Sequence, residues 1–212
     1  MRKIWNMKFT LLLLVPILLL SASAPMPDAF DIRQAYTEIP LKYLPLTSIY
    51  VKGKQDNSET RDEILTYHNS AREYISLKIK DNPMKGQLQL YKSASAYYIA
   101  IEHTACKDGC ENEFVILQKT TSGYTDVTLE VLKDVDLNLG NIRGTLKKQF
   151  KKSYGTDDAF KDSGYKDDET LNKHLFWQID DQSGLIYLKE SSLPHIIATY
   201  KWNEKKASFS KQ

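Results

Sequence analysis

Apolar and polar residues alternate with a period of two along most of the chain, which is the pattern of strands that bury one face. Residues 75–79 and 87–90 alternate in this way on either side of a turn-forming segment at 81–86, which predicts a β-hairpin. We expect a mainly β fold, built as an antiparallel meander or sandwich. Further strands are predicted at 97–103, 114–119, 124–132, 175–179, 185–188, 196–202 and 207–210, between turn-forming segments.

Helical spacing of apolar residues is confined to two segments, 59–71 and 141–152, which predicts one or two short helices. Residues 155–169 are acidic and punctuated by glycine, so we expect a long surface loop there. Residues 25–58 hold four prolines followed by a polar stretch. Because proline disfavours helix in the residue before it, we expect this segment to run extended into a loop.

The remaining chain, residues 59–212, is predicted to form a single antiparallel β-rich domain. The order strand, turn, strand, serine break and strand occurs at 74–102 and again at 175–202, which indicates a candidate duplication of a hairpin-rich unit with halves 59–132 and 141–212. Two different offsets align the halves equally well. Short strands joined by hairpins resemble one another in any case, so chance similarity remains an alternative.

The N-terminus has the features of a secretory signal peptide. Basic residues precede a run of 12 apolar residues, Phe9 to Leu20, and small residues follow it. This run is too short to cross ~30 Å of hydrocarbon as a helix. We therefore expect residues 1–24 to be removed and the protein to be exported, to the periplasm or the medium if the host is a bacterium. No stable membrane span is expected after cleavage.

The cleavage position has alternatives. A cut after Ala24 fits the pattern of small residues that signal peptidases accept. Pro25 would then follow the cut and constrain a backbone that the peptidase must hold extended, so cuts after Ser23 or Ala22 stay open. Met7 is an alternative start, because it begins a complete shorter signal.

The net charge of the chain bears on whether nucleic acid is a partner. The full chain carries 29 basic and 27 acidic residues, for a net charge of +2. Removal of the predicted signal peptide takes away Arg2, Lys3 and Lys8 and leaves 26 basic and 27 acidic residues, for a net charge of −1. A chain without a positive field is not expected to bind nucleic acid.

The only two cysteines, Cys106 and Cys110, are separated by the turn-forming residues Lys-Asp-Gly. Because an exported protein meets an oxidising compartment, we expect a disulfide at the mouth of a hairpin. The alternatives are a redox pair and a metal site in which His103 joins the two thiolates, a set suited to copper or zinc. The spacing is similar to that of copper-delivery thioredoxin-like proteins, but a strand rather than a helix is predicted to follow it.

The sequence contains no short motif of a hydrolase, metalloprotease, phosphate-binding loop or dinucleotide-binding domain. The four histidines, at 68, 103, 174 and 195, are scattered. We therefore expect a binding or interaction protein that is not an enzyme and needs no cofactor, with a protein, peptide or glycan as its partner. Thirteen tyrosines offer candidate contacts for such a partner. A metal-handling protein and a hydrolase with a site assembled from distant residues remain the alternatives.

Overall fold

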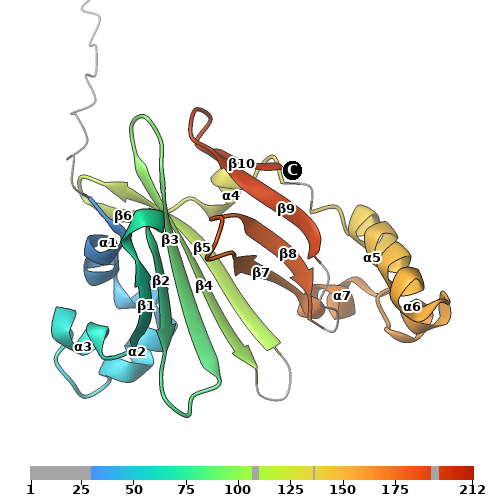
Figure 1. Ribbon diagram of the computed structural model, residues 1–212, viewed down its shortest axis with the longest axis horizontal. Helices are drawn as coiled ribbons and strands as arrows, with labels where there is room; N and C mark the ends of the chain where they lie inside the picture. The colour runs from blue at the N-terminus through green and yellow to red at the C-terminus, as the bar shows by residue number, and fades with distance from the viewer. Residues whose placement is uncertain (1–29, 107–109, 136, 192–195) are drawn as a thin grey trace, which may run out of the picture.

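The computed structural model describes residues 30–106, 110–135, 137–191 and 196–212, without the side chains of Cys106, Cys110 and Glu111. The predicted signal peptide lies outside this part of the chain. Two antiparallel sheets form the centre of the fold, one with the strand order β1-β2-β3-β4-β5-β6 and one with the order β10-β9-β8-β7 (Figure 1). Both are meanders, as the alternating pattern predicts.

The larger sheet contains β1 (Leu65–Asn69), β2 (Tyr74–Lys78), β3 (Met84–Lys92), β4 (Tyr97–Cys106), β5 (Cys110–Thr120) and β6 (Gly123–Asp126). The smaller sheet contains β7 (Leu175–Ile179), β8 (Ile186–Glu190), β9 (Ile196–Asn203) and β10 (Ser208–Lys211). The α-helices are α1 (Ile32–Glu38), α2 (Pro45–Val51), α3 (Ser58–Asp62), α4 (Thr128–Val131), α5 (Leu139–Tyr154), α6 (Asp158–Asp162) and α7 (Asp168–His174). Short 3-10 helices span Leu41–Tyr43 (η1) and Ser70–Arg72 (η2).

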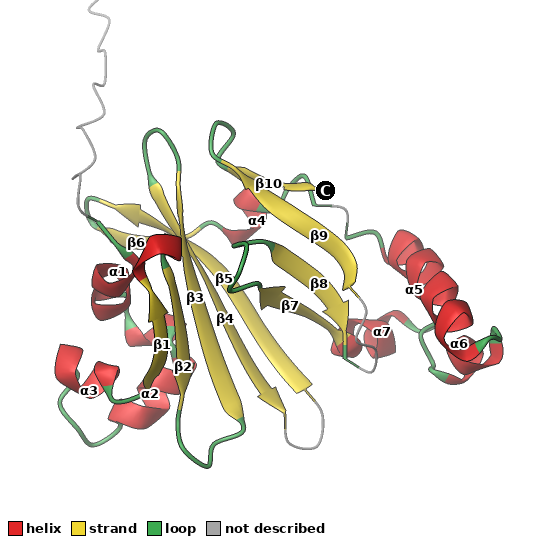
Figure 2. Cartoon of the chain, viewed as in Figure 1, coloured by secondary structure: helices red, strands yellow, loops and turns green. Residues whose placement is uncertain are grey.

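The expectation of a mainly β fold with one or two helices is wrong, because the described residues form seven α-helices beside the two sheets (Figure 2). The segment 25–58 does not run extended through its described part. The helices of this segment begin at residues that favour a helix N-terminus. The Asp31 side chain accepts the Gln34 N–H at 2.8 Å and caps α1, and Pro45 occupies the first position of α2, where it costs no hydrogen bond.

Three further segments differ from the prediction. Residues 59–71, expected as a helix, are helical only as far as Asp62 of α3 and then form strand β1 and the 3-10 helix η2. Residues 155–169, expected as a loop, contain α6 and the start of α7, where Asp167 caps the helix by accepting the Thr170 N–H at 2.7 Å. Residues 124–132, expected as one strand, end their pairing at Asp126 and continue as α4. Helices of four to seven residues leave too short a periodic pattern to be read from sequence.

The larger sheet is covered on both faces (Figure 1). Helices α1 and α2 pack on one face, where Ile99 and Ile101 are buried, and α3 packs against α2. The smaller sheet and helices α4 to α7 build the core on the other face, to which Tyr98 and Ala100 belong. Successive residues of a strand point to opposite faces, so β4 contributes to both cores in turn.

Edge strand β7 attaches the smaller sheet to the larger one. The Asn112 amide of β5 donates to the Trp177 carbonyl at 3.2 Å and accepts the Trp177 N–H at 2.9 Å, which replaces the backbone partner that an edge strand lacks. Phe114 stacks on Trp177 with ring centroids 5.4 Å apart. Hydrogen bonds as well as side-chain packing therefore hold the two sheets together. Within the described residues, no helix has the length and apolar character needed to cross a membrane.

Candidate functional site

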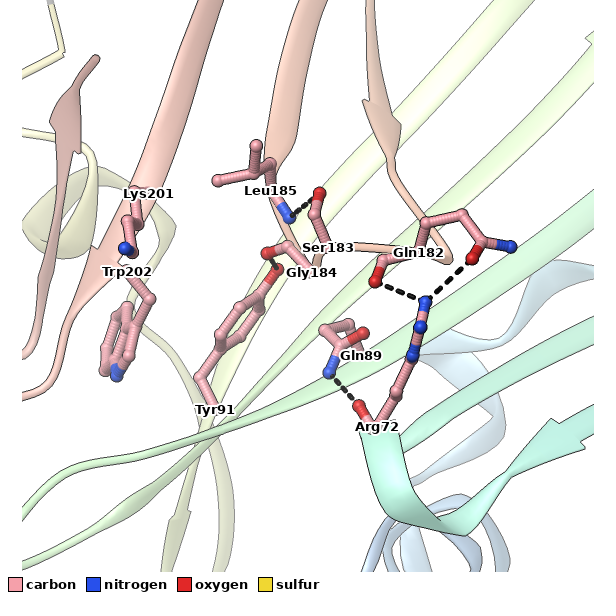
Figure 3. Close-up of a pocket in the computed structure, with 9 residues that line it drawn as sticks. All are labelled: Arg72, Gln89, Tyr91, Gln182, Ser183, Gly184, Leu185, Lys201 and Trp202. Carbon is pink, nitrogen blue, oxygen red and sulfur yellow. Dashed lines mark hydrogen bonds between the residues drawn. The ribbon is translucent and has the colours of Figure 1, made fainter.

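A pocket of about 250 Å³ lies where the turn between β7 and β8 meets the larger sheet (Figure 3). Side chains from both sheets line it. Tyr91 of β3 and Trp202 of β9 lie toward one side, Arg72 lies toward the other with Gln89 between it and Tyr91, and the turn residues Gln182 to Leu185 lie above them in this view. The pocket therefore exists only while the two sheets are docked.

Gln89 forms the floor of the polar side. Its side chain is 5% exposed, and its Nε2 donates to the Arg72 carbonyl at 2.6 Å and to the Leu90 carbonyl at 3.1 Å. Because both neighbours of Nε2 are acceptors, the orientation of the amide is fixed. Gln89 Oε1 is buried and has no hydrogen-bond partner among the described residues. A buried acceptor without a donor is costly, so this oxygen is a candidate group for binding a donor.

Arg72 connects the larger sheet to the turn that lines the pocket. Its Nη1 donates to the Gln182 carbonyl, to Gln182 Oε1 at 2.9 Å and to the Asp181 carbonyl at 3.3 Å (Figure 3). All three acceptors are neutral, and Arg72 forms no ion pair within the described residues. The guanidinium thus keeps its charge and two of its nitrogens available at the pocket.

The aromatic side is held rigidly. The Tyr91 hydroxyl donates to the Gly184 carbonyl at 2.9 Å, and burial keeps the pKa of this phenol far above its usual value, so it remains a donor. The Trp202 indole lies 5.4 Å from the Tyr91 ring and donates its Nε1–H to the Lys92 carbonyl at 2.7 Å. Gly184 has φ +66 and faces the Gln89 amide, a backbone conformation that other residues rarely adopt.

A second polar cluster lies between the larger sheet and β7. Glu102 is buried, and its carboxylate accepts from Thr104 Oγ1 and, at 3.3 Å, from Asn112 Nδ2. In the amide orientation that satisfies its neighbours, Gln87 donates to Glu102 and to the Ile179 carbonyl. Burial raises the pKa of Glu102 to about 7, against hydrogen bonds from Thr104 and the Ile179 backbone. This cluster joins the sheets but does not line the pocket.

The residues of the predicted disulfide or metal site are only partly described. Backbone register places Cys106 opposite Cys110 at the end of the β4–β5 hairpin, while both side chains lie outside the described residues. The disulfide and the metal site therefore stay predictions. Within the described ranges, no group of three or more His, Cys, Asp or Glu side chains is placed to hold a metal ion.

His103 is buried on the face of β4 that points toward the N-terminal helices. It is 3% exposed and packs against Gly86, where an added Cβ would lie 3.1 Å from the ring. Burial lowers the pKa of His103 to about 4, and its Nε2 has no hydrogen-bond partner among the described residues. The pocket lies on the opposite face of the sheet, so the structure does not bring His103 to it.

The alternative of a hydrolase site can be examined at His174. Its Nδ1 lies 2.8 Å from Ser191 Oγ and 4.0 Å from Glu190 Oε1. In a catalytic triad the serine and the acid bind different ring nitrogens, whereas here both face Nδ1. The Tyr165 hydroxyl donates to the same fully buried Glu190. The arrangement anchors α7 against β8. His68 lies on β1, and His195 lies outside the described residues.

The residues of the pocket carry no signal in the sequence that predicts a site. Gln87 and Gln89 alternate with Leu88 and Leu90, and this pattern predicts that the glutamines face solvent. They instead face the smaller sheet, because both sides of β3 are covered. The β7–β8 turn, which is distant in sequence, completes the pocket. No local sequence motif predicts the pocket. Comparisons with models of known protein families, with curated proteins and with solved structures found no match, so the functional argument depends on this site.

Proposed function

We propose that this protein is an exported, non-catalytic binding protein that holds a small ligand in the pocket between its two sheets. The observation that carries the proposal is the lining of the pocket, where the rings of Tyr91 and Trp202 face the polar groups of Arg72 and Gln89. Binding sites for small molecules combine apolar surface with a few fixed polar groups in this way.

The positions of the ionisable groups support binding rather than catalysis. Catalytic acids and bases with shifted pKa values are found in clefts, where a substrate reaches them. Here the two strongest candidates, Glu102 and His103, are both buried and neither lines the pocket. Among the described pocket-lining residues, Ser183 is the only serine or threonine, and its hydroxyl bonds to the Asp180 carboxylate of its own turn.

Trp202 provides a test of binding. The protein recovered from an exporting host would be labelled with ¹⁵N, and its indole N–H resonances followed while sugars, amino acids, organic acids and nucleosides are added. We expect at least one compound to shift the Trp202 resonance in a saturable way and to leave the Trp177 resonance in place. Trp202→Phe and Trp177→Phe variants assign the two signals. If none of these compounds shifts the Trp202 resonance, the pocket is not a binding site for small polar molecules and the proposal fails.

A further inference from the structure

The groups that line the inter-sheet pocket also restrict the chemistry of its ligand, and this inference rests on the proposed function. Gln89 Oε1 requires a donor. Its amide cannot turn to offer Nε2 instead, because Nε2 is held by the carbonyls of Arg72 and Leu90. Gln89 Oε1 is covered in this structure, with Gly184 of the β7–β8 turn beside it. A ligand that displaces this turn slightly would satisfy the oxygen with an N–H or O–H group.

Arg72 requires the opposite kind of group. A guanidinium has five N–H donors, and hydrogen bonds to described residues are made by Nη1 alone. The donors on Nε and Nη2 are free to bind an acceptor on the ligand. A hydroxyl both donates and accepts, so a pair of neighbouring hydroxyls satisfies Gln89 and Arg72 together.

The side of the pocket across from Arg72 and Gln89 is aromatic (Figure 3). Tyr91 and Trp202 there present ring carbon to the pocket, while their own polar atoms are bound to the carbonyls of Gly184 and Lys92. This side offers contact to C–H groups. A ligand that fits both sides carries hydroxyls along one edge and C–H groups on a face, as the ring of a sugar does.

Charge and size narrow the class further. Arg72 and Lys201 at the pocket are balanced by Asp180 and Asp181 in the β7–β8 turn, so the surroundings favour neither sign of charge. The volume of about 250 Å³ equals that of roughly eight water molecules at ~30 Å³ each, which suits a single hexose ring. We propose that the pocket binds a neutral carbohydrate unit of monosaccharide size, free or at the end of a glycan.

The test is isothermal titration of the exported protein with the methyl glycosides of glucose, galactose, mannose and N-acetylglucosamine. N-acetylalanine methylamide, a blocked amino acid of similar size, represents peptides. Glucuronate and glucosamine test charge. We expect one or more methyl glycosides to bind more tightly than the blocked amino acid, and neither sign of charge to improve the affinity.

Substitutions of Gln89 and Arg72 test whether the glycoside binds at these side chains. Gln89→Leu removes the buried acceptor and is expected to weaken glycoside binding by about tenfold or more. The matched control is Gln34→Leu at an exposed position of helix α1, on the far side of the larger sheet, which should bind as the parent does. If Gln89→Leu does not fold, Arg72→Met at the exposed edge of the pocket decides, with an expected weakening of several-fold.

The outcomes separate the two proposals. If none of the probes binds, the proposed function fails together with the inference. If the blocked amino acid or a charged probe binds while no neutral glycoside does, the pocket is a binding site and the carbohydrate assignment is overturned. Glycoside binding that is unchanged in Gln89→Leu and in Arg72→Met also overturns it, because the binding would then occur elsewhere.

Discussion

At the scale of single residues, burial acts in opposite directions on two neighbours in β4. Glu102 points toward the smaller sheet and has its pKa raised from 4.5 to about 7. His103 points toward the N-terminal helices and has its pKa lowered from 6.5 to about 4. Both shifts have the same cause, since burial disfavours the charged form of either group.

These shifts predict that the two groups contribute to the pH dependence of the unfolding free energy with opposite signs. Between pH 4.5 and 6.5, the folded protein binds more protons at Glu102 than the unfolded chain does, so acidification stabilises the fold through this residue. At His103 the folded protein binds fewer protons, so acidification destabilises the fold in the same window. The two contributions, each up to ~1.4 kcal/mol per pH unit, nearly cancel in the parent protein.

Single variants should expose each contribution. In urea unfolding at about pH 5 and pH 6.5, Glu102→Gln is expected to lose stability on acidification relative to the parent, and His103→Gln to gain it. The difference in unfolding free energy between the two pH values is the readout, so a uniform loss of stability in either variant does not disturb the test. Slopes of the same sign in both variants would show that at least one group is not buried as described.

Gly86 is the residue that makes room for His103. An added Cβ would lie 3.1 Å from the imidazole and 3.4 Å from Leu77, so Gly86→Ala is expected to destabilise the protein by about 1–3 kcal/mol. In a double-mutant cycle with His103→Ala, the loss should be smaller than the sum of the single losses. Gly144→Ala in helix α5, where a Cβ meets nothing within 4 Å, is the control and should be neutral or stabilising by up to ~1 kcal/mol. Additive losses would contradict the packing described.

At the scale of elements, Asn112 holds edge strand β7 against the larger sheet through both backbone groups of Trp177. Asn112→Ala leaves these groups and the Glu102 carboxylate with fewer partners. We expect a loss of about 2–4 kcal/mol in the free energy of unfolding and faster hydrogen exchange at the Trp177 amide. Asn172→Ala, at an exposed position of helix α7, is the control. An unchanged exchange rate at Trp177 would mean that packing alone holds β7 in place.

The β4–β5 hairpin carries the disulfide prediction. Residues directly opposite each other in an antiparallel pair have Cα atoms about 4.5–5.5 Å apart, within the range that a disulfide spans, and Cys106 lies opposite Cys110. We expect the intact mass of protein from an exporting host to be lower by two hydrogen atoms than that of its reduced form. The Cys106→Ser, Cys110→Ser double variant should lose only about 1–2 kcal/mol of stability because the closed loop is short. Two free thiols in the untreated protein would refute the disulfide.

The alternating pattern predicted most strands of both sheets because strand periodicity depends on the nearest neighbours in the chain. It failed for the short helices that precede each sheet in the chain, where capping by Asp31 and Asp167 decides the structure. It also misplaced Gln87 and Gln89, since no local signal shows that a second sheet covers the polar face of β3. The pocket could therefore not be predicted from the sequence, because it depends on contacts between segments about 90 residues or more apart, such as Tyr91 and Gly184.

At the scale of the whole molecule, the two sheets act together. The larger sheet supplies Gln89 and Tyr91, the smaller sheet supplies the β7–β8 turn and Trp202, and Arg72 bonds across the junction. Because neither sheet holds the pocket by itself, a ligand bound there must stabilise the docked arrangement. Binding and sheet docking are then coupled.

Hydrogen exchange of the exported protein, with and without a saturating methyl glycoside, shows whether ligand binding and sheet docking are coupled. We predict slower exchange in two separate segments at once, residues 89–92 of β3 and residues 182–186 of the β7–β8 turn, with little change in helices α1 to α3. Protection confined to one sheet, or protection elsewhere on the molecule, would contradict a binding site at the junction of the sheets.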